Sequence, residues 1–223
     1  MSFNVAIDGP AGAGKSTVAK AVAKQMGLIY VDTGAMYRAM ALYMLREGVD
    51  LKDTRKIAGK CTGADITIRY EDGVQVVYLN GENVNAYLRT EEVGEAASVT
   101  SPVPQVRENM VRLQKALAAS SDCIMDGRDI GTCVLPNAQL KIYLTASSEV
   151  RAKRRYDELT AKGESCILAN IKADIEERDY RDMHREMSPL KQAEDAVLVD
   201  TSDMTQDEVI DAVLKLCSKA REK

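Results

Sequence analysis

The chain has no tryptophan, a single phenylalanine and a single histidine among its 223 residues. Large aromatic rings therefore contribute little to its core, which must be built from valine, isoleucine, leucine, alanine and methionine, with nine tyrosines as the main source of rings. An excess of positive charge is also missing, since the formal net charge is −4. Binding to a DNA or RNA backbone needs a basic face, so we expect no nucleic-acid partner.

Long apolar runs and paired cysteines are absent as well. No segment approaches the roughly 18 consecutive apolar residues that span a membrane, and the N-terminus lacks the basic and then apolar pattern of a signal peptide. The five cysteines are scattered, odd in number and never in a Cys-x-x-Cys pair, which favours reduced thiols over disulfides or a zinc site. We therefore expect a cytoplasmic protein with no membrane partner.

What the chain does have is a glycine-rich loop of the phosphate-binding pattern. Residues 9–16 read Gly-Pro-Ala-Gly-Ala-Gly-Lys-Ser, in which two glycines separated by four residues are followed by a lysine and a hydroxyl residue. The glycines let successive backbone N–H groups point at phosphate oxygens. Lys15 can then reach the β- and γ-phosphates of a nucleoside triphosphate, and Ser16 can reach a magnesium ion.

The flanking segments give this loop the setting that phosphate binding requires. Residues 3–8 form a short apolar run suited to a buried strand, and apolar residues recur at helical spacing over 18–26, up to Gly27 as a helix C-cap. Strand, glycine loop and helix in this order are the context in which the motif binds phosphate. The sequence therefore predicts that one set of residues binds the triphosphate: Gly9, Pro10, Ala11, Gly12, Ala13, Gly14, Lys15, Ser16 and Thr17.

Further apolar runs predict the rest of an α/β fold. Residues 28–32, 123–125, 140–144 and 196–199 are candidate strands, and helical stretches separate them. Together with residues 3–8 they predict a P-loop NTPase-type parallel sheet of about five strands, covered by helices on both faces.

One region departs from this alternation of strands and helices. Residues 65–70 and 74–79 alternate polar and apolar side chains with period two, and the Asn-Gly pair at 80–81 is a tight-turn signal leading to a third short strand at 82–84. We predict that residues 62–90 form a small antiparallel sheet inserted into the core or packed beside it. The alternative is an edge extension of the main sheet.

Acidic and basic side chains follow two of the predicted strands. Residues 32–38 read Asp-Thr-Gly-Ala-Met-Tyr-Arg, and residues 126–132 read Asp-Gly-Arg-Asp-Ile-Gly-Thr. Because α/β sheets bind ligands at the carboxyl ends of their strands, we expect Arg38 and Arg128 to contact a ligand rather than to form surface ion pairs. A guanine-reading Asn-Lys-x-Asp segment is missing, which argues against a GTPase switch.

Five segments together resemble the bacterial cytidylate kinases. They are residues 8–17, 32–38, 89–93 (Arg-Thr-Glu-Glu-Val), 126–132 and 177–185 (Glu-Arg-Asp-Tyr-Arg-Asp-Met-His-Arg). They occur in the order of that family and span nearly the whole chain, and the predicted hairpin resembles the extra sheet of the bacterial members. The resemblance implies a monomeric enzyme of pyrimidine nucleotide metabolism that transfers the γ-phosphoryl group of ATP to CMP or dCMP, with Mg²⁺ as its cofactor.

The resemblance also assigns residues to the acceptor. By similarity, the phosphate of CMP is held by Thr33, Arg38, Arg128 and Arg185. The cytosine is read by Ser98, Arg107 and Asp129. The sugar hydroxyls are bound by Arg178 and Asp182. An acid and a donor complement the cytosine edge, which offers an amino donor beside ring-nitrogen and carbonyl acceptors. Uracil reverses the donor pattern, so the same site is expected to reject it.

A further arginine cluster lies in the stretch that corresponds to the mobile lid of nucleoside monophosphate kinases. Arg151, Arg154 and Arg155 are three and four residues apart, which places them on one helical face. We expect this face to close over the transferring phosphoryl group, the alternative being a solvated face. Arg154 is assigned to ATP, and Lys15, Arg128, Arg151 and Arg155 are the expected catalytic residues.

The expected reaction needs charge neutralisation more than it needs a base. The attacking phosphate oxygen is already anionic at neutral pH, so no general base is proposed, and the single histidine, His184, is expected to be an exposed helix residue. Magnesium would be held by Ser16 and, directly or through water, by Asp126.

We expect one P-loop kinase domain with three parts. The core comprises about residues 1–35, 100–147 and 186–223, the acceptor-binding part with the β insertion about 36–99, and the lid about 148–185. Two other functions stay open at this point: a P-loop kinase for another small acceptor, and a non-catalytic nucleotide-binding switch or assembly protein.

Overall fold

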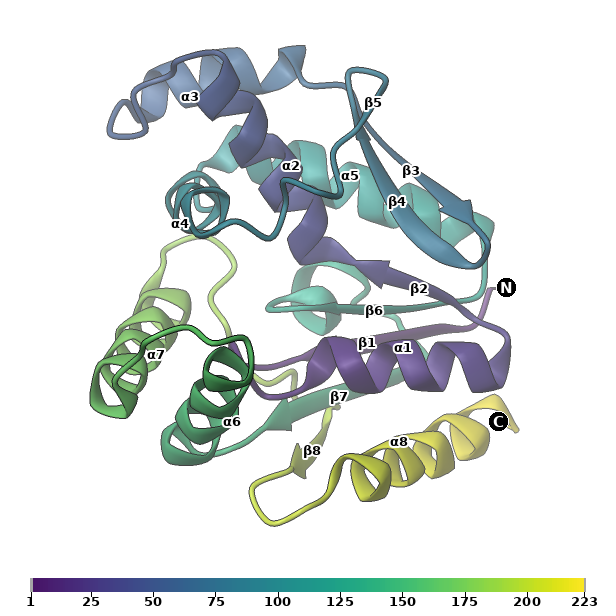
Figure 1. Cartoon of the computed structure of the whole chain (residues 1–223). Coiled ribbons are helices and arrows are strands. Elements are labelled where there is room, and N and C mark those ends of the chain that lie inside the picture. Colours follow the sequence, from purple (N-terminus) through teal and green to yellow (C-terminus); the bar gives the residue numbers. More distant parts are fainter. Residues whose placement is uncertain (1, 223) are drawn as a thin grey trace. The chain divides into compact units, whose positions relative to one another are not determined.

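A computed structural model of the chain describes residues 2–222, which divide into two compact units (Figure 1). The first unit comprises the described residues up to Tyr30 and from Ser121 on, and the second runs from Val31 to Ser120. A five-stranded sheet has the strand order β2-β6-β1-β7-β8, and a three-stranded sheet has the order β3-β4-β5.

The first unit is built on parallel strands. β1 (Asn4–Asp8) lies between β6 (Cys123–Gly127) and β7 (Leu140–Thr145) and pairs with both in parallel, and β8 (Val197–Asp200) continues the sheet beyond β7. Asp8 is in register with Gly127. Since β1 and β6 run in the same direction, the segments that follow them leave the sheet at the same edge.

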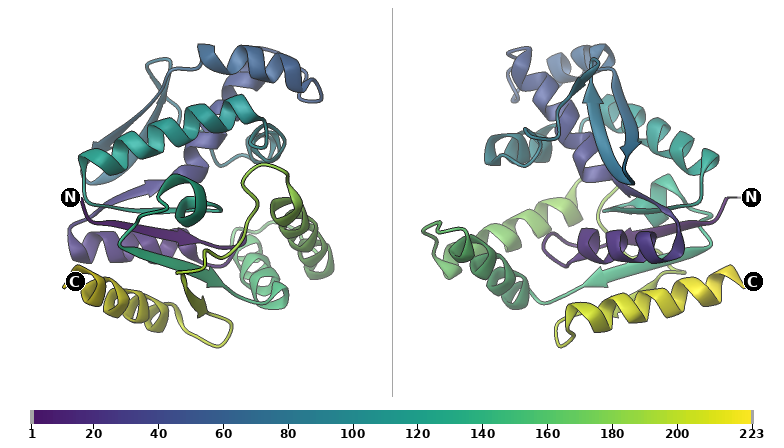
Figure 2. Two further views of the ribbon diagram at one scale, coloured as in Figure 1. Left: turned by 180° about the vertical axis from the view of Figure 1, so that it is seen from behind. Right: turned by 45° about the vertical axis from the view of Figure 1, so that its right-hand side comes forward.

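Two helices of this unit pack against the sheet. α1 (Lys15–Met26) and α8 (Gln206–Arg221) lie side by side in Figures 1 and 2. Val22 of α1 and Val213 of α8 join Val5, Ile7 and Ile142 of the sheet in one apolar cluster, in which each is at most 1% exposed. Burying a side chain of this size stabilises the fold by about 1.5–3 kcal/mol. This cluster is the core beneath the glycine loop.

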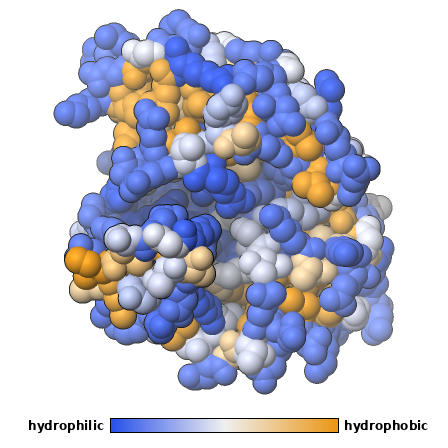
Figure 3. Space-filling view, viewed as in Figure 1, coloured by the Kyte–Doolittle hydropathy of each residue, from blue (hydrophilic) through white to orange (hydrophobic). Residues whose placement is uncertain are grey.

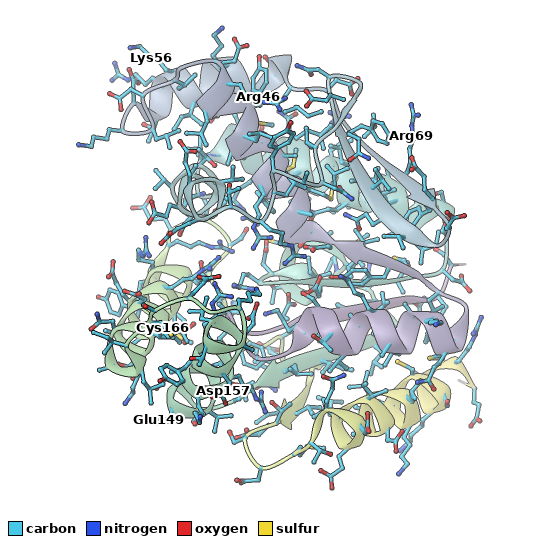
Figure 4. The ribbon with its side chains drawn as sticks, viewed as in Figure 1. Arg46, Lys56, Arg69, Glu149, Asp157 and Cys166 are labelled. Atoms are coloured by element: carbon cyan, nitrogen blue, oxygen red, sulfur yellow. The ribbon has the colours of Figure 1, made fainter. Side chains whose placement is uncertain are left out.

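Two further helices of the first unit, α6 (Ser148–Ala161) and α7 (Leu168–His184), form a hairpin with little apolar burial. They are joined by hydrogen bonds and ion pairs such as Lys172–Glu149 at 2.6 Å. Figure 4 labels Glu149 and Asp157 on α6 and Cys166 in the connection, and Figure 3 shows apolar atoms scattered over a largely hydrophilic face. Elements with few buried apolar contacts open at low free-energy cost.

The second unit begins within β2 (Ile29–Asp32), which crosses the boundary between the units, and continues into α2 (Thr33–Arg46). Met36, Met40 and Met44 of α2 are fully buried, four residues apart on one face. The other elements are α3 (Thr54–Lys60), the 3₁₀ turn η1 (Cys61–Gly63), β3 (Ile66–Glu71), β4 (Val74–Leu79), β5 (Glu82–Asn83), α4 (Glu91–Thr100) and α5 (Pro104–Ser120).

The predicted α/β fold is confirmed. Every predicted strand of the five-stranded sheet is present within two residues of its expected bounds, and the C-cap at Gly27 has a φ of 67°. The hairpin forms a separate antiparallel sheet, so the alternative of an edge extension is wrong. β5 ends at Asn83, one residue earlier than predicted. The cysteines are free thiols, and among the described residues no helix is both long enough and apolar enough to span a membrane.

Candidate active site

The glycine loop between β1 and α1 is pressed against the neighbouring strand β7. At Gly9, where φ is 148°, a Cβ atom would lie 1.9 Å from the main-chain oxygen of Leu144, so no other residue fits. Gly14 precedes α1 in the left-handed conformation, and the loop therefore runs directly into the helix N-terminus. Free N–H groups and the positive end of the helix dipole make this end of α1 suited to a phosphate.

Lys15, the first residue of α1, is held inside this loop. Its side chain is buried and its Nζ donates a hydrogen bond to the main-chain oxygen of Pro10 at 2.7 Å. Burial, and then the positive charge of Arg128, lower the pKa of Lys15 to about 7, although Asp126 and Asp8 oppose the shift. An anionic phosphate in the loop would favour the ammonium form.

Ser16, Asp126 and Tyr30 form an oxygen-rich cluster beside the loop. Ser16 Oγ donates to one carboxylate oxygen of Asp126 at 2.6 Å, and the Tyr30 hydroxyl donates to the other at 3.1 Å. Among the described residues, no group of three or more His, Cys, Asp or Glu side chains could hold a metal alone. A hydroxyl and one carboxylate nevertheless fit Mg²⁺, which binds few protein ligands and takes the others from phosphates and water.

Asp8, the last residue of β1, fastens the turn that follows β6. Its buried carboxylate accepts hydrogen bonds from the main-chain N–H groups of Ile130 and Gly131, both at 2.7 Å, at the start of the π-helical turn η2 (Ile130–Val134). Burial raises the pKa of Asp8 to about 6, against the effect of these two hydrogen bonds. Asp8 stands inside the first motif but was given no role from the sequence.

The raised pKa of Asp8 predicts a pH-dependent effect of Asp8→Asn on stability. Between pH 3.8 and about 6 the folded chain binds more protons at Asp8 than the unfolded chain, so ionisation opposes folding as the pH rises. The free energy of unfolding of the variant, relative to that of the wild type, should therefore rise by on the order of 3 kcal/mol between pH 4 and pH 7, whatever the difference between the two proteins at pH 4.

Urea unfolding of both proteins across this pH range would measure the gain. Asp200→Asn is the control: hydrogen bonds from Ser202 lower the pKa of Asp200, so its contribution to stability is lost as the pH falls, and the slope should have the opposite sign. A difference between Asp8→Asn and the wild type that does not change with pH would contradict the prediction.

Arg128, after β6, belongs to a charged cluster with α7 and the segment after it. Its Nε donates to Asp182 at 2.8 Å, and Arg185 lies 3.9 Å from Asp182 and 3.7 Å from Asp129. Burial alone would raise the pKa of Asp182, but the positive charges of Arg128, Arg185 and Arg178 outweigh it and the pKa is lowered. The structure thus brings together the predicted acceptor residues of the first unit.

Arg151 is the arginine of α6 that contacts the glycine loop. Its buried guanidinium donates to the main-chain oxygens of Ala146 at 2.9 Å and of Ala11, in the loop, at 3.1 Å. It also pairs with the buried Asp179 of α7 at 2.7 Å. Arg151 therefore links the loop to both α6 and α7. Asp179 lies within the 177–185 motif, but the sequence assigned it no role.

The other two arginines of the predicted lid cluster have different partners. Arg154 donates to the main-chain and hydroxyl oxygens of Thr201 at 2.8 and 3.2 Å. Arg155 pairs with Glu158 at 3.0 Å on the exposed surface of α6. Neither contact reaches the loop, and the assignment of these arginines to ATP or to catalysis stays a prediction.

The remaining predicted acceptor residues lie in the second unit. Thr33 is the buried first residue of α2, and Arg38 follows one turn later. A Cβ atom at Gly34 would lie 3.2 Å from Arg38 Nη1, so the guanidinium rests directly over this glycine. Arg107 of α5 is buried, with its guanidinium 5.6 Å from the ring centre of Tyr37. Ser98, also assigned to the cytosine, lies on α4.

His184 is the last residue of α7 and is exposed, as predicted. Its ring stacks on Tyr180 with centroids 4.0 Å apart, and its Nδ1 lies 2.8 Å from the Tyr180 main-chain oxygen. Both contacts are made within one helical turn, as is ordinary for a surface residue at the end of a helix.

The chain is similar to known proteins over almost its full length. The family model described as cytidylate kinase matches residues 5–219. Over 217 residues the chain is 49% identical to a cytidylate kinase of Caldicellulosiruptor bescii, covering 97% of this chain and 96% of the relative, and 49% identical to one of Lactobacillus johnsonii, covering 97% and 94%. A solved gluconokinase from Sinorhizobium meliloti 1021 shares the fold, with a TM-score of 0.51 at 13% identity, covering 99% of this chain and 94% of that chain.

Proposed function

The chain belongs to the cytidylate kinase family, and we propose that it transfers the γ-phosphoryl group of ATP to CMP or dCMP, giving ADP and CDP or dCDP. The observation that carries this proposal is the proximity, within the first unit, of the glycine loop with Lys15 to the turn that carries Arg128. Arg128, assigned to CMP, directly follows β6, while Asp8, which directly precedes the glycine loop, is in register with Gly127 and accepts hydrogen bonds from Ile130 and Gly131. The positive charges of Arg128 and Arg178 also contribute to lowering the pKa of Lys15 in that loop. A donor loop and acceptor arginines at one sheet edge suit transfer between two phosphates.

The residues would act by binding and neutralising charge. The N–H groups at the start of α1 and Lys15 would hold the β- and γ-phosphates of ATP, and Arg128 would offset charge on the group being transferred. An acceptor phosphate oxygen needs no base to attack. Magnesium, held by Ser16 and Asp126 together with ATP oxygens, would neutralise further phosphate charge.

Residues 148–185 are proposed to act as a lid within a single kinase domain. The polar contacts that hold α6 to α7 and the loop contact through Arg151 support this role. Arg154 and Arg155 would then reach ATP only after movement of α6, since they contact Thr201 and Glu158. We further propose that the protein acts as a monomer in the cytoplasm.

The acceptor is tested by supplying ATP and Mg²⁺ with CMP, dCMP, UMP, AMP or GMP and following ADP release. Strong preference for the two cytosine nucleotides is the expected result. Turnover with another nucleotide in preference to CMP would indicate a kinase for a different acceptor. Binding of ATP without turnover of any of the five would contradict a nucleoside monophosphate kinase function.

Asp182→Ala is expected to weaken CMP binding about tenfold or more while changing ATP binding less than about twofold. The carboxylate is proposed to bind the sugar hydroxyls and also orients Arg128, so its loss removes charge-assisted hydrogen bonds on the acceptor side. Calorimetric titration with each nucleotide measures both affinities. Asp174→Ala, an exposed aspartate of the same helix, is the matched control. Equal losses of affinity for both nucleotides would remove Asp182 from the sugar site.

A further inference from the structure

The small sheet of the second unit is fastened to α2 at both ends of that helix. At the C-terminal end, Arg46 donates to both carboxylate oxygens of Glu82, at 2.6 and 3.0 Å; Figure 4 labels Arg46 at this end of α2. At the N-terminal end, the contact is made by Gln75 of β4 with Asp32, the residue before α2. A helix of 14 residues is about 20 Å long, so the two contacts are widely separated.

The Gln75 side-chain amide bonds the main-chain N–H and C=O of Asp32, as the backbone of a neighbouring strand would. Its Oε1 accepts a hydrogen bond from the Asp32 main-chain N–H at 2.7 Å, and its Nε2 donates to the Asp32 main-chain oxygen at 3.2 Å. Only one orientation of the amide satisfies both, since the N–H can only donate and the carbonyl only accept. Gln75 itself is held by Asn85, whose Nδ2 donates to the Gln75 main-chain oxygen at 3.2 Å.

Asp32, which receives this contact, organises the first turn of α2. One of its carboxylate oxygens caps the helix by accepting from the Ala35 N–H at 2.9 Å, and the other accepts from Arg89 at 2.9 Å. A Cβ atom at Gly34 would lie 3.2 Å from both the Asp32 carboxylate and the Arg38 guanidinium, so the three residues fit without spare room. Displacing the Asp32 backbone would therefore shift Thr33 and Arg38.

We propose that Gln75 is a positioning residue for the acceptor nucleotide, holding the Asp32 backbone so that Thr33 and Arg38 face the CMP phosphate. This inference rests on the proposed assignment of Thr33 and Arg38 to that phosphate. Loss of the side-chain amide would leave the Asp32 N–H and C=O without these partners and loosen the first turn of α2. The contacts of Gln75 with Asp32 and Asn85 lie within the second unit, whereas the ATP loop belongs to the first.

The test is Gln75→Leu, which keeps the approximate size of the side chain and removes both hydrogen bonds. We expect the KM for CMP to rise about tenfold, as the loss of two hydrogen bonds implies, while the KM for ATP and kcat change less than about twofold. Glu82→Gln is the matched control, because it weakens the contact at the other end of α2 and leaves Asp32 untouched. It should change the KM for CMP less than about twofold.

Gln75→Glu provides a second variant if Gln75→Leu does not fold, as judged by thermal denaturation. It retains an acceptor for the Asp32 N–H but loses the donor to the Asp32 oxygen, so it should still raise the KM for CMP. Equal changes in the KM for CMP and for ATP, or the same rise in Glu82→Gln, would show a general structural role and overturn the inference.

Arg38→Ala separates a failure of the inference from a failure of the proposed function. If Arg38→Ala raises the KM for CMP and neither Gln75 variant does, the positioning role is wrong and the acceptor assignment stands. If Arg38→Ala and both Gln75 variants leave the KM for CMP unchanged, both are wrong. A rise in the Gln75 variants that is smaller in the Arg38→Ala background supports action through Arg38, because residues that act through one another are not additive.

Discussion

Lys15→Ala is expected to reduce kcat by roughly 10²- to 10³-fold while the protein remains folded. The ammonium is buried in the glycine loop, where its charge is little screened, and it would stabilise charge that develops on the phosphates during transfer. Because this interaction is stronger in the transition state than with bound ATP, the loss should appear mainly in kcat. ADP release with saturating ATP and CMP measures it.

The same substitution should not lower the melting temperature. The pKa of Lys15 falls from 10.5 to about 7 on folding, so between these values the unfolded chain binds more protons and the ammonium opposes folding at neutral pH and below. Removing it relieves this cost. Lys24→Ala, an exposed lysine of the same helix, is the control and should leave both properties unchanged. Turnover near normal in Lys15→Ala would refute the phosphate-loop assignment.

Asp179→Ala is expected to destabilise the protein by about 3 kcal/mol or more. It leaves the buried guanidinium of Arg151 without its charge partner, and breaking a buried pair from one side has a large cost. Urea unfolding followed by circular dichroism measures the change. Glu149→Gln removes one partner of the exposed Lys172–Glu149 pair between the same two helices and should cause a much smaller loss. Equal losses would contradict the prediction.

Combining Arg151→Met with Asp179→Leu should restore most of the lost stability, since apolar side chains of similar size often replace a buried ion pair at little cost. The folded double variant then distinguishes two roles of Arg151. We expect the turnover of the double variant to be slower than that of the wild type, because Arg151 is proposed to contact ATP phosphate once the lid closes. Recovery of normal turnover would show that Arg151 only ties the loop to the lid.

The elements that the sequence predicted well are those with a local signal. Apolar runs, most of them ended by glycine or an acid, placed the strands of the main sheet within two residues, and the period-two alternation of 74–79 gave β4 with its observed bounds. The glycine loop was recognisable because its backbone requirements exclude other residues, as the approach of Gly9 to Leu144 illustrates. His184 was expected to be an exposed helix residue because the reaction needs no general base, and it is exposed at the end of α7.

The contacts that fix the site could not be predicted in the same way. Arg151 and Asp179 lie on different helices, and nothing in their spacing states that they pair. Gln75 occupies a polar position of an alternating strand, where a solvent-facing side chain is the ordinary expectation. Its partner is 43 residues away, and that distance is bridged only by tertiary packing. Asp8 lies in a motif, but its hydrogen bonds to the main chain of η2 depend on the parallel register of β1 and β6.

Three of the contacts around the glycine loop end on main-chain atoms. Lys15 donates to the oxygen of Pro10, Arg151 to that of Ala11, and Asp8 accepts from the N–H of Ile130. A main-chain oxygen is present whatever side chain the position carries, and a main-chain N–H is present in every residue except proline. Substitutions at Pro10, Ala11 and Ile130 can therefore leave these hydrogen bonds in place, whereas substitutions of Lys15, Arg151 or Asp8 remove them.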